Sequence, residues 1–291
     1  MTFNDDAQIS GNKVKRRGRG AAVGGGVGIV GVIVYFIFQA VTGIDPGTIV
    51  PQGGTGGGSD EQVAACTGEE ANNGNLDCRL AGTAESLDDY WSETLPAMGV
   101  DYRTPEFILF TGSVTTGCGN ATSASGPFYC PPDETVYIDT DFYADLESKY
   151  GASGGPLAQM YVLAHEWGHH VQNISGIMNG LDLQTTGPAS DGVRLEVQAD
   201  CFAGSWVAAA SSTEDASGDA YLKPATDAEI RDALSAASAV GDDRIQESTQ
   251  GQVTPETWTH GSSESRQKWF LAGYKGGPDA CNSFEVSDGA V

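Results

Sequence analysis

The sequence predicts an α+β domain that follows a single N-terminal transmembrane helix. Residues 20–42 contain no charged side chain, and an apolar run of that length can span a bilayer. Downstream, short segments with strand patterns occur among segments with helical periodicity. The roughly 230 residues beyond the apolar run are enough to bury one core, so a single domain is expected.

The residues before the apolar run predict its orientation. Residues 1–19 are polar, and they include five basic side chains: Lys13, Lys15, Arg16, Arg17 and Arg19. A basic flank normally stays on the cytoplasmic side. We therefore expect residues 1–19 to be a cytoplasmic tail, residues 43–62 a flexible Gly/Pro-rich linker, and residues 63–291 an extracytoplasmic domain. The protein would be a single-pass protein of the cell membrane, with its substrates near the membrane surface.

The predicted span has a repeat of small residues. Gly20, Gly24 and Gly28 recur every four residues, a spacing that brings helices close together in membranes. A homodimer through this face is one possibility, and a span that simply tolerates glycine is the other.

The overall charge restricts the class of partner. The chain has a formal net charge of −24, and the part after the apolar run carries 10 basic and 37 acidic residues. An acidic surface repels phosphate backbones, so we exclude nucleic acid as a partner. The simplest interpretation of the charge is solubility.

The six cysteines indicate disulfides. None lies in a C-x-x-C pair, so a cysteine zinc site is not expected. Two short separations favour the local bridges Cys66–Cys78 and Cys118–Cys130, which leaves Cys201–Cys281. Buried free thiols are the alternative. Disulfides would indicate an oxidising compartment, in agreement with the predicted orientation.

The first half of the domain combines helix and strand patterns. Residues 83–97 have apolar side chains at helical spacing, residues 106–111 and 135–139 have strand patterns, and a helix is predicted over residues 156–174. Val136–Asp139 is expected to be a strand edge to which a peptide can add as another strand. A plain core strand is the alternative.

Two further helices are predicted near the C-terminus. Thr226 and Glu229 have the spacing of a capping box, before a helix that reaches about Val240. The last helix is predicted from about Ser263 to Tyr274, followed by two glycines that can end it.

One short motif within the 156–174 helix carries the chemistry. It is an H-E-x-x-H run, His165-Glu166-Trp167-Gly168-His169. Histidines four residues apart on a helix share one face, so both rings can bind one zinc ion. Glu166 is rotated by about 100° from His165. It would lie beside the metal, where a general base can take a proton from a zinc-bound water.

A second motif supplies a candidate third ligand. Catalytic zinc sites usually have three protein ligands, and Glu196 can be the third one, from a following helix. Asp200 lies one helical turn after Glu196. It can accept a hydrogen bond from the free ring nitrogen of His165 and so set its tautomer. The alternative for this pair is an exposed acidic face.

The chain resembles a family of bacterial neutral zinc metallopeptidases. Five stretches carry the resemblance, which runs from about Leu87 to Tyr274: His165–Gln172, Arg194–Gly204, Gly126–Pro131, Val136–Asp139 and Thr259–Phe270. It implies a membrane-anchored, zincin-like fold that is distantly similar to the gluzincins. It also implies His165, His169 and Glu196 as ligands of one Zn²⁺ and Glu166 as the catalytic residue.

Other side chains are candidates for lesser roles. His260 is expected to stabilise the oxyanion, or else to cap or pack the helix near Ser263. Arg266 and Tyr221 are weaker candidates for that donor. We expect His170 to lie outside the ligand set, and Trp167 and Phe202 to belong to the core.

These expectations lead to one main functional hypothesis and two alternatives. The main hypothesis is a membrane-anchored zinc peptidase, an endopeptidase rather than an exopeptidase, that acts on peptides or proteins. One alternative is a zinc-stabilised binding or scaffold protein without turnover. The other is a zinc amidase that acts on cell-wall peptides. A general base beside the metal favours an enzyme.

Overall fold

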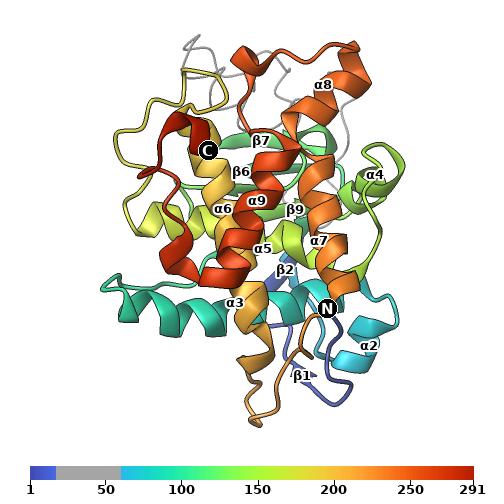
Figure 1. Ribbon diagram of the computed structural model, residues 1–291. Helices are drawn as coiled ribbons and strands as arrows, with labels where there is room; N and C mark the ends of the chain where they lie inside the picture. The colour runs from blue at the N-terminus through green and yellow to red at the C-terminus, as the bar shows by residue number, and fades with distance from the viewer. Residues whose placement is uncertain (18–59) are drawn as a thin grey trace.

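The computed structural model describes residues 1–17 and 60–291, which form an α+β fold (Figure 1). Its strands are β1 (Gln8–Ile9), β2 (Val14–Arg17), β3 (Asp60–Gln62), β4 (Cys66–Thr67), β5 (Glu106–Phe110), β6 (Ser113–Thr116), β7 (Gly119–Thr122), β8 (Phe128–Cys130) and β9 (Thr135–Asp139). Its α-helices are α2 (Gly68–Asn72), α3 (Leu76–Ala97), α4 (Phe142–Ser148), α5 (Pro156–Ile174), α6 (Asp191–Ala209), α7 (Asp227–Ala239), α8 (Asp242–Gln250) and α9 (Ser263–Gly276).

The main sheet has five strands in the order β3-β2-β5-β9-β8. Strands β2, β5 and β9 are parallel, and β3 and β8 are antiparallel strands at the two edges. The interior positions of β5 and β9 are buried apolar residues, as expected for strands covered on both faces. Two small sheets, β1–β4 and β6–β7, lie outside the main sheet.

Helix α5 lies between the sheet and the other large helices (Figure 1). Pro156 occupies the first turn of α5, where its missing N–H costs nothing. Helices α6 and α9 pack side by side, and their close approach requires glycine. A Cβ atom on Gly273 would lie 1.8 Å from the backbone oxygen of Cys201. This contact helps to determine where α6 presents its side chains to α5.

The predicted transmembrane architecture is wrong. Among the described residues, we find no helix that is both long enough and apolar enough to cross a membrane. The expected span, residues 20–42, and its glycine face, Gly20, Gly24 and Gly28, lie outside the described residues. Residues 14–17, expected to be part of a cytoplasmic tail, instead form β2 within the main sheet. Lys15 is the register partner of Gln62 on one side and of Ile108 on the other. A single membrane crossing between β2 and β3 would prevent that pairing.

The basic residues of this segment misled the prediction because their partners are far away in sequence. Lys13 pairs with Asp88, Lys15 with Glu106, Arg16 with Asp77 and Arg17 with Asp60. The sequence separations range from 43 to 91 residues. Residues 13–17, which resemble a cytoplasmic flank, therefore form ion pairs with the sheet strands and with helix α3.

Most other predicted elements agree with the structure. Helix α5 and strand β9 have the predicted bounds, and both halves of the Thr226–Glu229 capping box are present. Helix α3 begins seven residues earlier than predicted, at Leu76, with Asn75 as its N-cap. The predicted strand edge is wrong, because β9 lies between β5 and β8. The actual edge on this side is β8.

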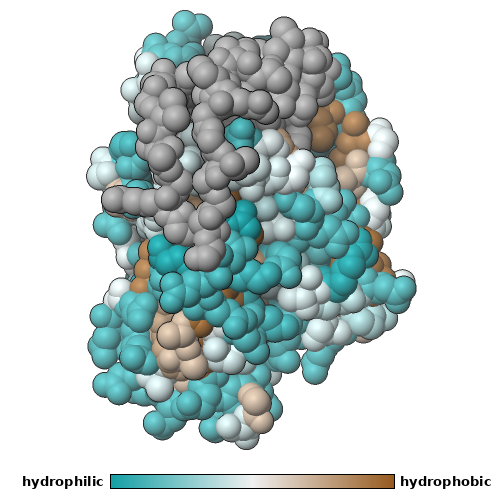
Figure 2. Space-filling model, turned by 180° about the vertical axis from the view of Figure 1, so that it is seen from behind, coloured by the Kyte–Doolittle hydropathy of each residue, from teal (hydrophilic) through white to brown (hydrophobic). Residues whose placement is uncertain are grey.

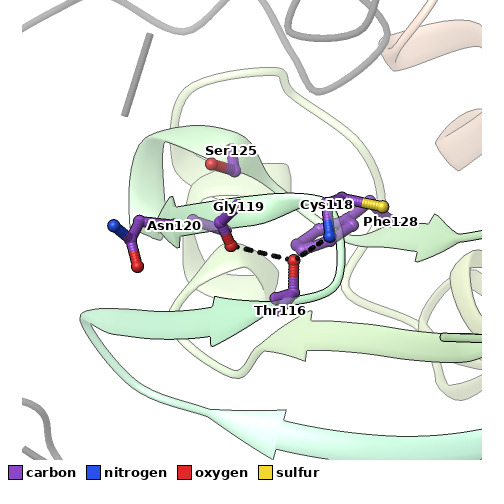
Figure 3. A pocket seen from close by; sticks show the side chains of 7 residues that line it. Thr116, Cys118, Gly119, Asn120, Ser125 and Phe128 are labelled. Carbon is purple, nitrogen blue, oxygen red and sulfur yellow. Dashed lines mark hydrogen bonds between the residues drawn. The ribbon is translucent and has the colours of Figure 1, made fainter. Parts of the chain in front are cut away.

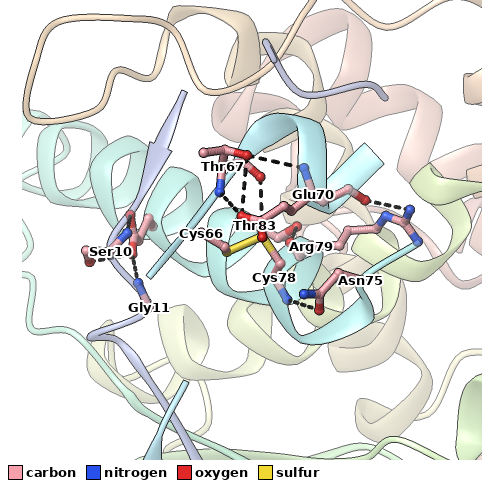
Figure 4. The surroundings of a disulfide bond; sticks show 11 residues. Ser10, Gly11, Cys66, Thr67, Glu70, Asn75, Cys78, Arg79 and Thr83 are labelled. Atoms are coloured by element: carbon pink, nitrogen blue, oxygen red, sulfur yellow. Dashed lines mark hydrogen bonds between the residues drawn. A yellow bond between two sulfur atoms is a disulfide. The ribbon is translucent and has the colours of Figure 1, made fainter. Parts of the chain in front are cut away.

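The three predicted disulfides are confirmed: Cys66–Cys78, Cys118–Cys130 and Cys201–Cys281. The first joins β4 to the start of α3, beside the N-cap residue Asn75 and the capping box of Thr67 and Glu70 (Figure 4). The second joins the β6–β7 hairpin to β8. The third joins α6 to the C-terminal segment.

The surface is mainly hydrophilic. On the face opposite to that of Figure 1, polar residues dominate outside the grey atoms (Figure 2). Within the described ranges, the exposed large hydrophobic side chains are Met98 and Val253. A small hollow under the β6–β7 hairpin is lined by residues that include Thr116, Asn120 and Phe128 (Figure 3). None of its lining residues is charged, and none belongs to the predicted metal site.

Candidate metal centre

Helices α5 and α6 bring the three predicted ligands together. The Nε2 atom of His165 lies 3.2 Å from Oε2 of Glu196, and Nε2 of His169 lies 3.4 Å from Oε1 of Glu196. One ligand atom from each residue lies within 4.8 Å of the other two. All three side chains are buried. The one group of this kind within residues 1–17 and 60–291 therefore consists of the three predicted residues.

The motif glycine permits the close contact between these helices. Gly168 faces α6, where an added Cβ atom would lie 3.0 Å from Cα of Ala199. Ala199 lies between Glu196 and Asp200, so this contact places both carboxylates over the histidines of α5.

The tautomer of His165 is set by Asp200. Nδ1 of His165 lies 2.8 Å from Oδ1 of Asp200. A carboxylate can only accept a hydrogen bond, so Nδ1 carries a proton and Nε2, which faces Glu196, is the ring atom that would bind a metal ion. The structure thus places Asp200 in the contact that the sequence predicts.

Asp200 is itself held by two buried side chains. Arg266 donates from Nε to Oδ2 at 2.8 Å and from Nη2 to Oδ1 at 3.0 Å, and the Tyr161 hydroxyl also donates to Oδ1. Burial raises the pKa of Asp200, but attraction to Arg266 and His165 outweighs this effect and leaves the pKa lowered. The carboxylate is therefore ionised, and its two oxygens are oriented. The role of Tyr161 was not predicted from the sequence.

The second ligand histidine has a different support. Nδ1 of His169 lies 2.8 Å from Oε1 of Gln172, one turn further along α5. Gln172 is the last residue of the His165–Gln172 stretch that carries the family resemblance, but the sequence did not indicate its role. Its i+3 position after His169 is the signal that was available.

The donor set fits a zinc ion. Oε1 of Glu196 is buried and receives no hydrogen bond. It lies 3.4 Å from Nε2 of His169, while Oε2 lies 3.2 Å from Nε2 of His165, so both rings and the carboxylate gather around one point. A buried arrangement of this kind is unfavourable unless a cation occupies its centre. Two imidazoles and one carboxylate form a usual set of protein ligands for catalytic zinc.

Glu166 lies beside the ligands with a free carboxylate. It accepts no hydrogen bond from any residue that the structure describes, and its side chain is 8% exposed. Burial raises its pKa above the usual value for glutamate. A carboxylate with these properties can accept a proton and later release it.

His260 contacts Asp242, and Glu196 also attracts it. Its Nδ1 atom lies 3.1 Å from Oδ1 of Asp242, while Oδ2 of Asp242 accepts backbone N–H groups from residues 259–261. Burial lowers the pKa of His260, but attraction to Asp242 and Glu196 outweighs it, so the pKa is raised. The sequence did not indicate Asp242, whose partner is 18 residues away.

The two weaker candidates for the oxyanion donor have other partners. Arg266 is bound to Asp200, behind His165. The Tyr221 hydroxyl donates to Glu85 at 3.0 Å, and Glu85 also binds residues 10 and 11. Tyr221 therefore belongs to the attachment of the N-terminal segment.

Three remaining side chains are in the core. Nε2 of His170 donates to the backbone oxygen of Arg103 at 2.6 Å, and the Tyr129 hydroxyl lies 3.0 Å from Nδ1. Burial lowers the pKa of His170 to about 4. It is neutral and directed away from the ligands, and Trp167 and Phe202 are buried.

Comparison with known proteins gives matches over most of the chain. A family model described as "Putative neutral zinc metallopeptidase" matches residues 3–284. The uncharacterized protein Rv2575 of Mycobacterium tuberculosis (strain ATCC 25618 / H37Rv) is 47% identical over 255 residues, which cover 84% of this chain and 85% of that protein. The uncharacterized protein YpfJ of Escherichia coli (strain K12) is 42% identical over 208 residues, 69% of each chain. No solved structure matches.

Proposed function

Because the chain belongs to the neutral zinc metallopeptidase family, we propose that it is a single-zinc peptidase that hydrolyses internal bonds of peptides or proteins. The observation that carries the proposal is the convergence of two Nε2 atoms and the unpartnered Oε1 of Glu196 on one buried point. Within the described residues this is the one such group, which supports one ion.

Each residue of the centre has a defined task in this proposal. A bound zinc ion supplies Lewis acidity, which polarises a carbonyl group and acidifies a water molecule. Glu166 takes the proton of the attacking water, because no described residue donates a hydrogen bond to its carboxylate, and passes it to the leaving amine. His260 stays protonated beside Asp242, so that its Nε2–H can donate to the oxygen that becomes negative.

Internal cleavage is favoured because Arg266, the cation near Glu166, is already bound to Asp200. Enzymes that remove C-terminal residues need a positive group for the terminal carboxylate. Within residues 1–17 and 60–291, the cation besides the histidines that acts on Glu166 is Arg266, and both oxygens of Asp200 already bind it. This arrangement supports an endopeptidase.

The disulfides support an oxidising compartment. Three bridges are present, and no cysteine of the chain is free. Structural disulfides persist outside the reducing cytosol. We therefore include folding in an oxidising compartment in the proposal.

The test compares the zinc-loaded full chain with its Glu166→Gln variant on a diverse peptide library, read by mass spectrometry. We expect cleavage at internal bonds by the parent only, with equal zinc content in both proteins. Zinc-loaded parent protein that cleaves nothing would instead indicate a binding or scaffold protein. Cleavage of cell-wall peptides with unfolded protein left intact would indicate an amidase.

A further inference from the structure

The two ligand histidines are supported in chemically different ways. Nδ1 of His165 faces the ionised Asp200, which Arg266 neutralises. Nδ1 of His169 faces a chain of neutral amides, formed by Gln172 and Gln198. Both glutamines are buried, with exposed fractions of 0% and 5%. Neutral polar side chains at this depth need a full set of partners.

Backbone carbonyl groups determine how the side-chain amides of Gln172 and Gln198 are oriented. Nε2 of Gln172 lies 2.7 Å from the backbone oxygen of Leu195. A carbonyl oxygen can only accept, so the NH₂ end of the amide must face α6 and Oε1 must face His169. Oε1 can only accept in turn. Nδ1 of His169 therefore carries the proton, and its Nε2 lone pair is left for the metal.

The second amide follows the same logic. Nε2 of Gln198 lies 2.7 Å from the backbone oxygen of Cys281, which must accept. Oε1 of Gln198 therefore faces Gln172 and accepts from its Nε2 at 3.1 Å. Both amide nitrogens, of Gln172 and of Gln198, therefore have an acceptor. Turning either amide around would leave the Leu195 or the Cys281 carbonyl without its donor.

The backbone carbonyl that orients Gln198 belongs to Cys281, and a disulfide fixes this residue covalently. Cys281 is bonded to Cys201 on α6, the helix that carries Glu196. The segment after Cys281 is also bound to α6, because the Ser283 hydroxyl donates to the backbone oxygen of Arg194 at 2.7 Å. The carbonyl that orients Gln198 is thus held in a constant position relative to Glu196.

We propose that Gln172 and Gln198 are positioning residues for His169, anchored by the Cys201–Cys281 disulfide. The proposal rests on the metal site of the proposed function and adds the residues that hold one of its ligands. Gln172 selects the tautomer of His169, Gln198 and the Leu195 carbonyl together hold the orientation of Gln172, and the disulfide fixes the group that orients Gln198. Metal affinity should therefore depend on all three.

The first test measures zinc affinity of the full chain by competition with a chromophoric chelator. We expect Gln172→Leu to weaken zinc binding about 10–100-fold, as loss of a partner of a ligand histidine does. Gln198→Met should weaken it less, because Leu195 still orients Gln172. The matched control is Gln267→Leu. It removes a hydrogen bond from a side-chain amide to the backbone oxygen of Leu234 and should leave the zinc affinity unchanged.

Gln172→Glu distinguishes positioning from general stability. A carboxylate still accepts from Nδ1 of His169, but it cannot donate to Leu195, so the metal-free protein should melt at a lower temperature than wild type. Zinc affinity should nevertheless exceed that of Gln172→Leu, and the absorption spectrum of the Co²⁺-substituted protein should stay close to that of wild type. Affinities that simply follow the melting temperatures of the metal-free variants would overturn the proposal.

The disulfide is tested with a pair of double variants. Cys201→Ala with Cys281→Ala should weaken zinc binding, whereas Cys118→Ala with Cys130→Ala should lower the melting temperature only. If the first double variant does not fold, Gln198→Met alone tests whether the Cys281 segment affects zinc binding.

Wild-type zinc affinity in both Gln172→Leu and Gln198→Met would overturn the positioning role. A wild-type chain that binds no zinc would overturn this proposal and the proposed function together, whereas zinc binding without cleavage would overturn only the latter.

Discussion

The metal centre and the N-terminal segment, residues 1–17, differ in how far apart along the chain their interacting residues lie. His165 and His169 are related by one helical turn, and so are Glu196 and Asp200. The cations of residues 13–17 instead meet carboxylates that are 43 to 91 residues away. A spacing rule can identify the first arrangement, because the helix itself fixes the geometry. It cannot identify the second, because only the packing of the segment against the sheet and helix α3 brings the partners together.

The largest expected effect on stability concerns the buried ion pair between Arg266 and Asp200, next to the metal centre. Arg266→Met removes the cation that compensates the buried Asp200, and breaking a buried ion pair costs about 3–5 kcal/mol. We expect the free energy of unfolding of the metal-free protein to fall by about that amount in denaturant titrations. Adding Asp200→Asn to this variant should recover part of the loss. An unchanged unfolding midpoint would show that the cluster is not needed for stability.

A comparable effect tests whether the N-terminal segment belongs to the domain. Phe3 is fully buried and packs over Gly82 of α3. Phe3→Ala should lower the free energy of unfolding by about 3–5 kcal/mol. Asp6→Ala, an exposed change in the same segment, is the control and should have little effect. Equal stability of both variants would restore the interpretation of residues 1–17 as a separate tail.

The next effect concerns turnover at the metal centre. His260→Ala should reduce kcat about 10²–10³-fold, the range for loss of one oxyanion donor, while zinc affinity is retained. Asp242→Asn should cause a smaller loss, because it removes the charge that keeps His260 protonated. Turnover by zinc-loaded His260→Ala at the parental rate would exclude the donor role.

The smallest expected effect concerns the ion pairs of strand β2. Lys15 and Glu106 are both exposed enough for water and salt to screen their attraction. Lys15→Gln should therefore change the free energy of unfolding by about 0.2–1 kcal/mol, and less at high salt. A loss of several kcal/mol, measured by the same titration, would mean that charge rather than apolar burial holds the segment in place.

Parts of the fold were predictable because their signals are local. The bounds of α5 and β9 and the capping box of α7 follow from periodicity and from residues within one or two turns. The edge position of β8 did not follow, because strand order depends on which segments meet in space. Strand β2 was missed for the same reason: Val14–Arg17 has one apolar residue and three cations, a poor strand signal until neighbours on both sides pair with it.

The sequence by itself determined the chemistry of the metal centre, since ligand type and helical spacing place three donors and a base on facing helices. It also indicated two disulfides through their short separations and the third, Cys201–Cys281, as the remaining pair. Only the tertiary structure decided how the side chains around the ligands are held: Asp200 by Arg266 and Tyr161, Gln172 by Gln198 and the Leu195 carbonyl, and His260 by Asp242. These contacts join residues on different elements, and hydrogen-bond direction and burial exist only once those elements are packed.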